Sequence, residues 1–133
     1  MTKFDVQTKF DGQIPVYQQI IQNIKGEIVT GKLKSGDKLP SVRELSEKLM
    51  VNPNTLQRVF MELEREGIVY SQRGIGNFVS ETPGLIESLK KTQARKYALR
   101  FIGEMQGLGL SFDEVISLIE KTMGERENDN TEC

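Results

Sequence analysis

Apolar residues recur every three or four positions in five segments of the chain, which is the spacing of helices that bury one face. The expected helices span about 15–30, 41–50, 53–66, 85–106 and 111–124. Between the third and the fourth helix, two short β-prone runs at 68–70 and 78–79 flank the sequence Arg-Gly-Ile-Gly. Glycines at that place favour a β-hairpin, because they adopt positive φ without a steric penalty. The pattern therefore predicts a mainly α chain with one small hairpin.

Polar residues and a proline indicate where these helices begin. Ser41–Glu44 and Ser111–Glu114 have the Ser-x-x-Glu form of a capping box. Pro53 is compatible with a first helical position, where the backbone N–H has no partner within the helix. Asn52, one position earlier, can then accept a hydrogen bond as the N-cap. The proline is therefore expected to start the third helix rather than to break it.

The first two turns of the third helix carry polar side chains away from the apolar stripe. These are Asn54, Thr55, Gln57 and Arg58. Asn, Gln and Arg can each bond two atoms of one base edge in the major groove of DNA. Taken alone, the cluster is compatible equally with an ordinary solvated surface. The order of helix, short helix, turn, helix and hairpin favours DNA, because it is the order of a winged helix-turn-helix.

Five stretches between Ile14 and Val79 read IPVYQQI, GKLKSGDKLPSVRELS, VNPNT, LEREG and RGIGNFV. Together they resemble the DNA-binding domain of the GntR family of bacterial transcription regulators. The NPNT sequence and the short remainder of the chain are similar to the YtrA-like branch of that family. The short helical second domain of that branch would correspond to GLGLSFDEVISLIEK, at 107–121.

The resemblance implies phosphate or base contacts from the second helix, the third helix and the hairpin. The full predicted DNA-binding set is Arg43, Asn52, Asn54, Thr55, Gln57, Arg58, Arg73, Gly74 and Gly76. Two alternatives stay open: Arg43 can instead pair with Glu47 one turn on, and the hairpin needs its glycines with or without DNA. Other branches of the family often carry arginines in place of Pro53 and Gln57, so the operator sequence is not predicted.

Composition excludes several other classes of function. The chain has 133 residues, no histidine, and a single cysteine at its last position, Cys133, which excludes disulfides and Cys/His zinc sites. The absence of histidine also excludes catalytic Ser-His and Cys-His pairs. No cofactor, no metal and no enzymatic activity are expected. No apolar run approaches the ~18 residues of a membrane span, and the N-terminus has no signal-peptide core, so a cytoplasmic protein is expected.

The last two predicted helices carry apolar faces that are too wide for the two helices to bury against each other alone. The predicted interface residues are Tyr97, Ala98, Phe101, Ile102, Met105, Leu108, Val115, Ile116 and Ile119. We expect a homodimer interface, because helix-turn-helix regulators commonly bind two-fold operators as dimers. Two alternatives are that these helices pack on the winged domain, and that they form an effector pocket shared between subunits.

The expected organisation has three parts. Residues 1–81 form the winged helix-turn-helix domain with a short N-terminal arm, 82–124 form the helical dimerisation domain, and 125–133 form an acidic disordered tail. The expected function is that of a homodimeric repressor on a pseudo-palindromic operator, and the resemblance implies a transporter operon as its target. The alternative is a winged-helix module that binds proteins without sequence-specific DNA binding.

Overall fold

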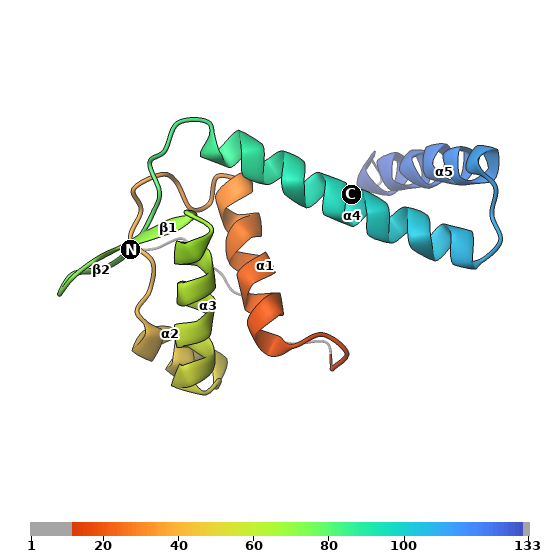
Figure 1. Cartoon of the computed structure of the whole chain (residues 1–133). Helices are drawn as coiled ribbons and strands as arrows, with labels where there is room; N and C mark the ends of the chain where they lie inside the picture. Colours follow the sequence, from red (N-terminus) through yellow and green to blue (C-terminus); the bar gives the residue numbers. More distant parts are fainter. Residues whose placement is uncertain (1–11, 132–133) are drawn as a thin grey trace. The chain divides into compact units, whose positions relative to one another are not determined.

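The computed structural model describes residues 12–131, and of 128–131 only the backbone (Figure 1). Its elements, in chain order, are α1 (Val16–Val29), α2 (Val42–Leu49), α3 (Pro53–Arg65), β1 (Val69–Gln72), β2 (Gly76–Val79), α4 (Leu85–Gly107) and α5 (Phe112–Thr131). The chain divides into two compact units, with the boundary between Lys91 and Thr92. This element order confirms the predicted helices and the predicted hairpin.

The core of the first unit is built from the predicted apolar stripes of α1, α2 and α3. Helix α3 packs against α1, α2 and β1, and it lies beside α1 in Figure 1. Ile20, Ile24, Leu45, Leu56 and Leu63 are completely buried. Each such side chain contributes about 1.5–3 kcal/mol when it is removed from water. The packing holds α3 with its other face exposed, which is the geometry of a winged helix-turn-helix.

Local hydrogen bonds start α2 and α3 at the predicted places. The Ser41 hydroxyl accepts from the Glu44 backbone N–H at 3.0 Å, and the Glu44 carboxylate accepts from the Ser41 N–H at 3.3 Å. The Asn52 side-chain oxygen accepts from the Asn54 N–H at 2.8 Å, and Pro53 is the first residue of α3. The capping box and the role of Pro53 are therefore confirmed.

The hairpin is an antiparallel pair of strands, in which Val69 is opposite Val79 and Gln72 is opposite Gly76. The Tyr70 and Phe78 rings stack across it, with centroids 5.6 Å apart. Gly74 has φ of +79° and Gly76 has φ of +143°. Both conformations are costly for residues with a side chain, so the turn itself requires these glycines.

The first turns of α4 belong to the first unit, which differs from the predicted boundary between 81 and 82. Leu89 is buried in the core of that unit, and Ile86 packs against it. The predicted boundary lies just before the turn at Pro83 and Gly84, but the core of the first unit includes residues that follow this turn. The first unit therefore includes residues up to Lys91.

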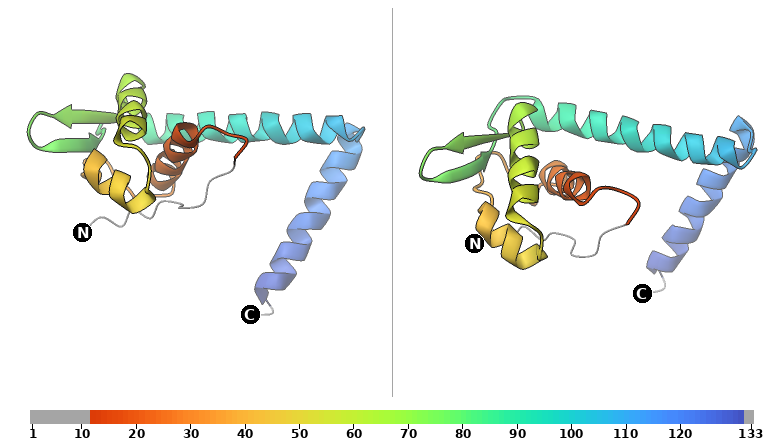
Figure 2. Two further views of the ribbon diagram at one scale, coloured as in Figure 1. Left: turned by 90° about the horizontal axis from the view of Figure 1, so that it is seen from below. Right: turned by 60° about the horizontal axis from the view of Figure 1, so that its bottom comes forward.

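The second unit consists of the rest of α4 and of α5, which diverge from the turn that joins them (Figure 2). The predicted capping box at the start of α5 is present: the Glu114 carboxylate accepts from the Ser111 N–H at 3.0 Å, and the Ser111 hydroxyl accepts from the Glu114 N–H at 3.3 Å. Helix α5 continues to Thr131 and so overlaps the predicted acidic tail, whose disorder stays a prediction. Glu and Arg are good helix formers, and an acidic composition does not by itself end a helix. Residues 132–133 lie outside the described part.

Candidate nucleic-acid interface

The N-terminal half of α3 presents a polar surface. Asn54, Gln57 and Arg58 are exposed and Thr55 is half-buried, while Leu56 and Val59 are buried in the core. We call Asn54, Thr55, Gln57 and Arg58 the α3 polar face. The helical period separates this face from the buried stripe, as predicted. A helix held in this way can enter the major groove with its polar face toward the bases.

The Arg58 guanidinium has a partner that the sequence did not predict. Its central carbon lies 3.7 Å from the centre of the Tyr17 ring, which belongs to the first turn of α1. Such a cation–π contact contributes about 0.5–1 kcal/mol at an exposed site. Tyr17 is one of the apolar residues that recur every three or four positions in α1, and it is half-buried. The only feature of the sequence that could have indicated this contact is the aromatic side chain in the first turn of α1.

Arg43 forms the ion pair that was left open as an alternative. Its Nε lies 3.4 Å from Glu47 Oε1, and the two side chains are 90% and 71% exposed. An exposed pair one turn apart on a helix contributes only about 0.3–0.5 kcal/mol. A DNA phosphate can replace the carboxylate at little cost, so the pair does not exclude a phosphate contact.

Asn52 has a structural role, since its side-chain oxygen caps α3. Its predicted contact with DNA stays a prediction, as do the contacts of the other predicted site residues. All of them belong to the first unit, on α2, at the start of α3 and on the hairpin.

Arg73 lies in the turn between β1 and β2, and its side chain is exposed. No carboxylate forms an ion pair with it within the described residues. The Lys38 side chain lies against the turn end of the hairpin, where its Cε is 2.9 Å from the position that a Cβ on Gly76 would occupy. The Arg73 guanidinium and the Lys38 stem thus both lie at the turn end of the hairpin. Lys38 was not predicted as a site residue.

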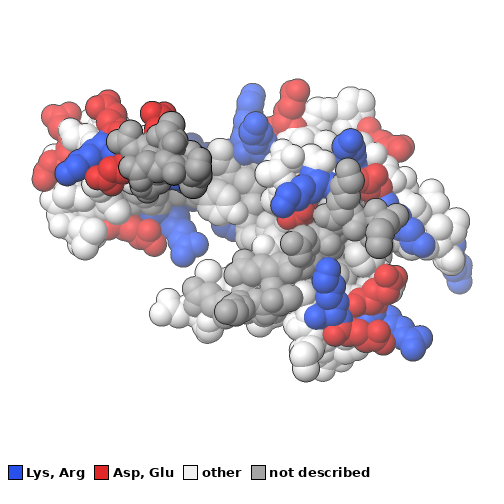
Figure 3. Space-filling model, turned by 180° about the vertical axis from the view of Figure 1, so that it is seen from behind, with Lys and Arg blue, Asp and Glu red and all other residues white. Residues whose placement is uncertain are grey.

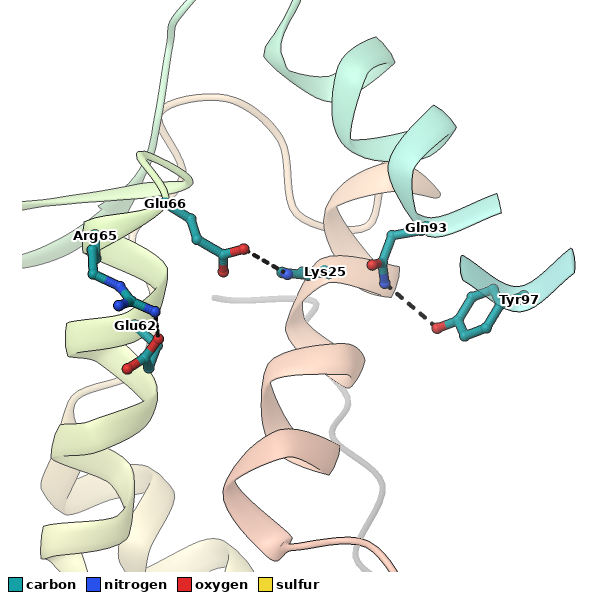
Figure 4. A network of polar contacts seen from close by, with 6 residues as sticks. All are labelled: Lys25, Glu62, Arg65, Glu66, Gln93 and Tyr97. Carbon is teal, nitrogen blue, oxygen red and sulfur yellow. Dashed lines mark hydrogen bonds and ion pairs between the residues drawn. The ribbon is translucent and has the colours of Figure 1, made fainter. Parts of the chain in front are cut away.

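An ion pair joins α1 to the C-terminal end of α3. Lys25 Nζ lies 3.2 Å from Glu66 Oε1, and the Lys25 side chain is only 10% exposed (Figure 4). Arg65 pairs with Glu62 on α3, and Gln93 donates to the Tyr97 hydroxyl within α4 at 3.5 Å. The Lys25–Glu66 pair braces the end of α3 that lies away from the α3 polar face.

Charge alone does not identify the binding surface. Basic and acidic side chains alternate on the face shown in Figure 3. Among the described residues, no group of three or more His, Cys, Asp or Glu side chains could hold a metal ion. None of the helices in the described range is long and apolar enough to cross a membrane.

Large apolar side chains are exposed on the second unit. Leu108 is 75% exposed, Tyr97 49% and Ile102 44%, and Ile116 and Ile119 of α5 are each 39% exposed. Four other members of the predicted interface set are half-buried or small: Phe101, Met105 and Val115 are half-buried, and Ala98 is exposed. Exposed large apolar side chains of this kind are typical of a surface that contacts a partner.

Two kinds of sequence comparison agree on the family of this chain. The model of a family described as "Bacterial regulatory proteins, gntR family" matches residues 16–79. An uncharacterized HTH-type transcriptional regulator of Bacillus subtilis, YhcF, is 40% identical over 112 residues, which are 84% of this chain and 93% of YhcF. The HTH-type transcriptional repressor YtrA of the same organism is 38% identical over 109 residues, which are 80% of this chain and 83% of YtrA.

Solved structures extend the similarity to both units. A GntR family transcriptional regulator from Listeria monocytogenes is 45% identical, with a TM-score of 0.77 over 84% of this chain and 98% of that one. The DNA-binding domain of AraR, in complex with operator ORX1, is 29% identical, with a TM-score of 0.53 over 56% of this chain and 96% of that domain. The second similarity is to a structure that contains DNA.

Proposed function

The chain belongs to the gntR family and is a DNA-binding transcription regulator rather than an enzyme; from that premise we propose that it is a homodimeric repressor of a pseudo-palindromic operator. It acts in the cytoplasm, where bacterial DNA is accessible. The observation that carries the proposal is the α3 polar face, held exposed at the start of α3 by a core that uses the opposite face.

The direction of regulation is proposed from a relative. YtrA is named a transcriptional repressor, and the similarity extends over 80% of this chain. A repressor of this kind can act by occupying its operator. Association with a transporter operon is proposed from the resemblance to the YtrA-like branch alone.

The homodimer is proposed from the exposed apolar surface of α4 and α5. One chain offers one recognition helix, whereas specific regulators reach Kd values of about 10⁻⁸ to 10⁻¹¹ M. A two-fold dimer would place two such helices about 34–36 Å apart, or a multiple of this distance, on one side of the duplex. The same surface would serve the effector alternative if it formed a pocket between two subunits.

Selection of genomic fragments tests the proposal directly. Fragments of the source organism's DNA that the wild-type chain retains are sequenced, and we expect them to share a two-fold related site with half-sites one helical turn or a multiple apart. Retention should fall steeply with salt, because each phosphate contact releases counterions.

The competing function, a protein-binding module, predicts a different result. No fragment would be enriched over random DNA, and a protein would co-purify even after nuclease treatment and at high salt. That combination would contradict the proposed function.

A further inference from the structure

Tyr17 and Arg58 form a contact between α1 and the α3 polar face. The two residues contribute unequally to it. Tyr17 is half-buried and packs against the core of the first unit, whereas Arg58 is exposed. The ring is therefore the fixed partner, and the arginine is the side chain whose orientation the contact decides.

The stack leaves the DNA-binding capacity of Arg58 intact. A guanidinium carries its N–H donors in its plane, so stacking one face on a ring leaves the donors at the edge available to phosphate or base oxygens. An unsupported arginine samples many rotamers, and ordering it costs as much as about 2 kcal/mol. Orienting the side chain before DNA arrives removes part of that cost, which is the general effect of preorganisation.

We infer that Tyr17 is a positioning residue for DNA binding, which acts by holding the Arg58 guanidinium in the orientation that meets the DNA. The inference rests on the proposed function. It makes the first turn of α1 a part of the recognition surface, although α1 carries none of the predicted contacts. The Tyr17 hydroxyl accepts a hydrogen bond from the Gln18 side-chain amide at 3.1 Å, so the role of the hydroxyl can be separated from that of the ring.

A purely structural contact is the competing explanation, in which the stack only ties α1 to α3. The two explanations predict different results when both residues are substituted. With a positioning role, the effects of the two substitutions on DNA affinity are not additive. With a purely structural role, only their effects on thermal stability are not additive.

A double-mutant cycle on DNA affinity decides between them. The wild type, Tyr17→Leu, Arg58→Ala and the double variant are compared on the selected operator at one salt concentration, together with their melting temperatures. We expect Tyr17→Leu to bind about two- to fivefold more weakly, Arg58→Ala to bind at least as weakly as Tyr17→Leu, and the double variant to bind no more weakly than Arg58→Ala. Tyr17→Phe should bind as the wild type does, because it keeps the ring.

Val16→Ala is the matched control, since it removes another half-buried side chain from the same turn of α1 but is not part of the stack. It should lower the melting temperature and leave the operator affinity of the folded protein unchanged. If Tyr17→Leu proves unfolded at the assay temperature, Tyr17→Met takes its place, because methionine fills an irregular gap without a ring.

Three results would overturn the inference while leaving the proposed function standing. They are wild-type affinity in Tyr17→Leu, losses from the two single variants that add in the double variant, and a loss in Tyr17→Phe equal to that in Tyr17→Leu. A wild-type chain that binds operator and random DNA equally would instead overturn the proposed function, and this inference with it.

Discussion

At the scale of single residues, Gln57 is the side chain of the α3 polar face best suited to read a base. It is exposed on α3, and a glutamine can bond two atoms of an adenine edge. We predict that Gln57→Ala costs about 1–3 kcal/mol on the operator and much less on random DNA. Fluorescence anisotropy on the two duplexes measures the difference. Equal losses on both would refute base reading by Gln57.

Arg43 gives a contrasting prediction, because a phosphate contact carries no sequence information. Arg43→Ala should weaken binding to both duplexes and flatten the slope of log K against log salt by about 0.9. Glu47→Ala is its matched control, since it removes the carboxylate that pairs with Arg43 in the free protein. That control should bind DNA at least as tightly as the wild type. An unchanged salt slope in Arg43→Ala would exclude the phosphate contact.

At the scale of elements, the hairpin allows DNA binding and stability to be separated. Arg73→Ala should weaken operator binding and leave the melting temperature nearly unchanged, because Arg73 is exposed in the turn. Gly76→Val should lower the melting temperature, because φ of +143° is unfavourable for a β-branched residue. Calorimetry and anisotropy on both variants test the separation. Wild-type affinity in Arg73→Ala would mean that the hairpin tip does not touch DNA.

The start of α5 should respond to acid. Hydrogen bonds from the Ser111 backbone and then its side chain lower the pKa of Glu114 from its usual 4.5, because both stabilise the carboxylate. The resulting stabilisation is complete above pH 4.5, and it is lost as the pH falls from there through the lowered pKa. Titration of the Glu114 side chain by NMR should show the shift, and Ser111→Ala should reduce it. An unchanged Glu114 titration in Ser111→Ala would contradict this account of the cap.

At the scale of the whole molecule, we predict that α4 and α5 make the dimer and that operator binding depends on it. Phe101→Glu would place an unpaired carboxylate in the interface, where a penalty of several kcal/mol should favour monomers. Lys96→Glu, on an exposed position of the same helix, controls for the added negative charge. Light scattering gives the mass of each variant, and we expect only Phe101→Glu to be monomeric and to bind the operator weakly.

Truncation completes this test. A chain cut after Lys91 keeps Leu89 in the core of the first unit, whereas a cut after Gly84 would remove it. The longer piece should be monomeric and should bind the operator more weakly than the full chain. A monomeric wild type, or a truncated chain that dimerises and binds as tightly, would contradict the dimer.

The sequence by itself determined the elements of this protein, because the signals for them act over short distances. Helical periodicity, the two capping boxes and the Asn52–Pro53 start involve residues within four positions of one another. The hairpin glycines also follow from a local requirement, positive φ. The α3 polar face was predictable for the same reason, since the burial of Leu56 and Val59 decides which side of the helix stays exposed.

Only the tertiary structure decided which distant residues meet. The stack of Arg58 on Tyr17 and the pair between Lys25 and Glu66 depend on how α1 and α3 pack, and the periodicity of either helix does not contain that geometry. The burial of Leu89 likewise moved the unit boundary into α4, because the core closes over residues that follow a turn in the sequence. Composition predicted disorder after 124, and the structure instead describes a backbone that stays helical to Thr131, because backbone hydrogen bonds depend little on side-chain charge.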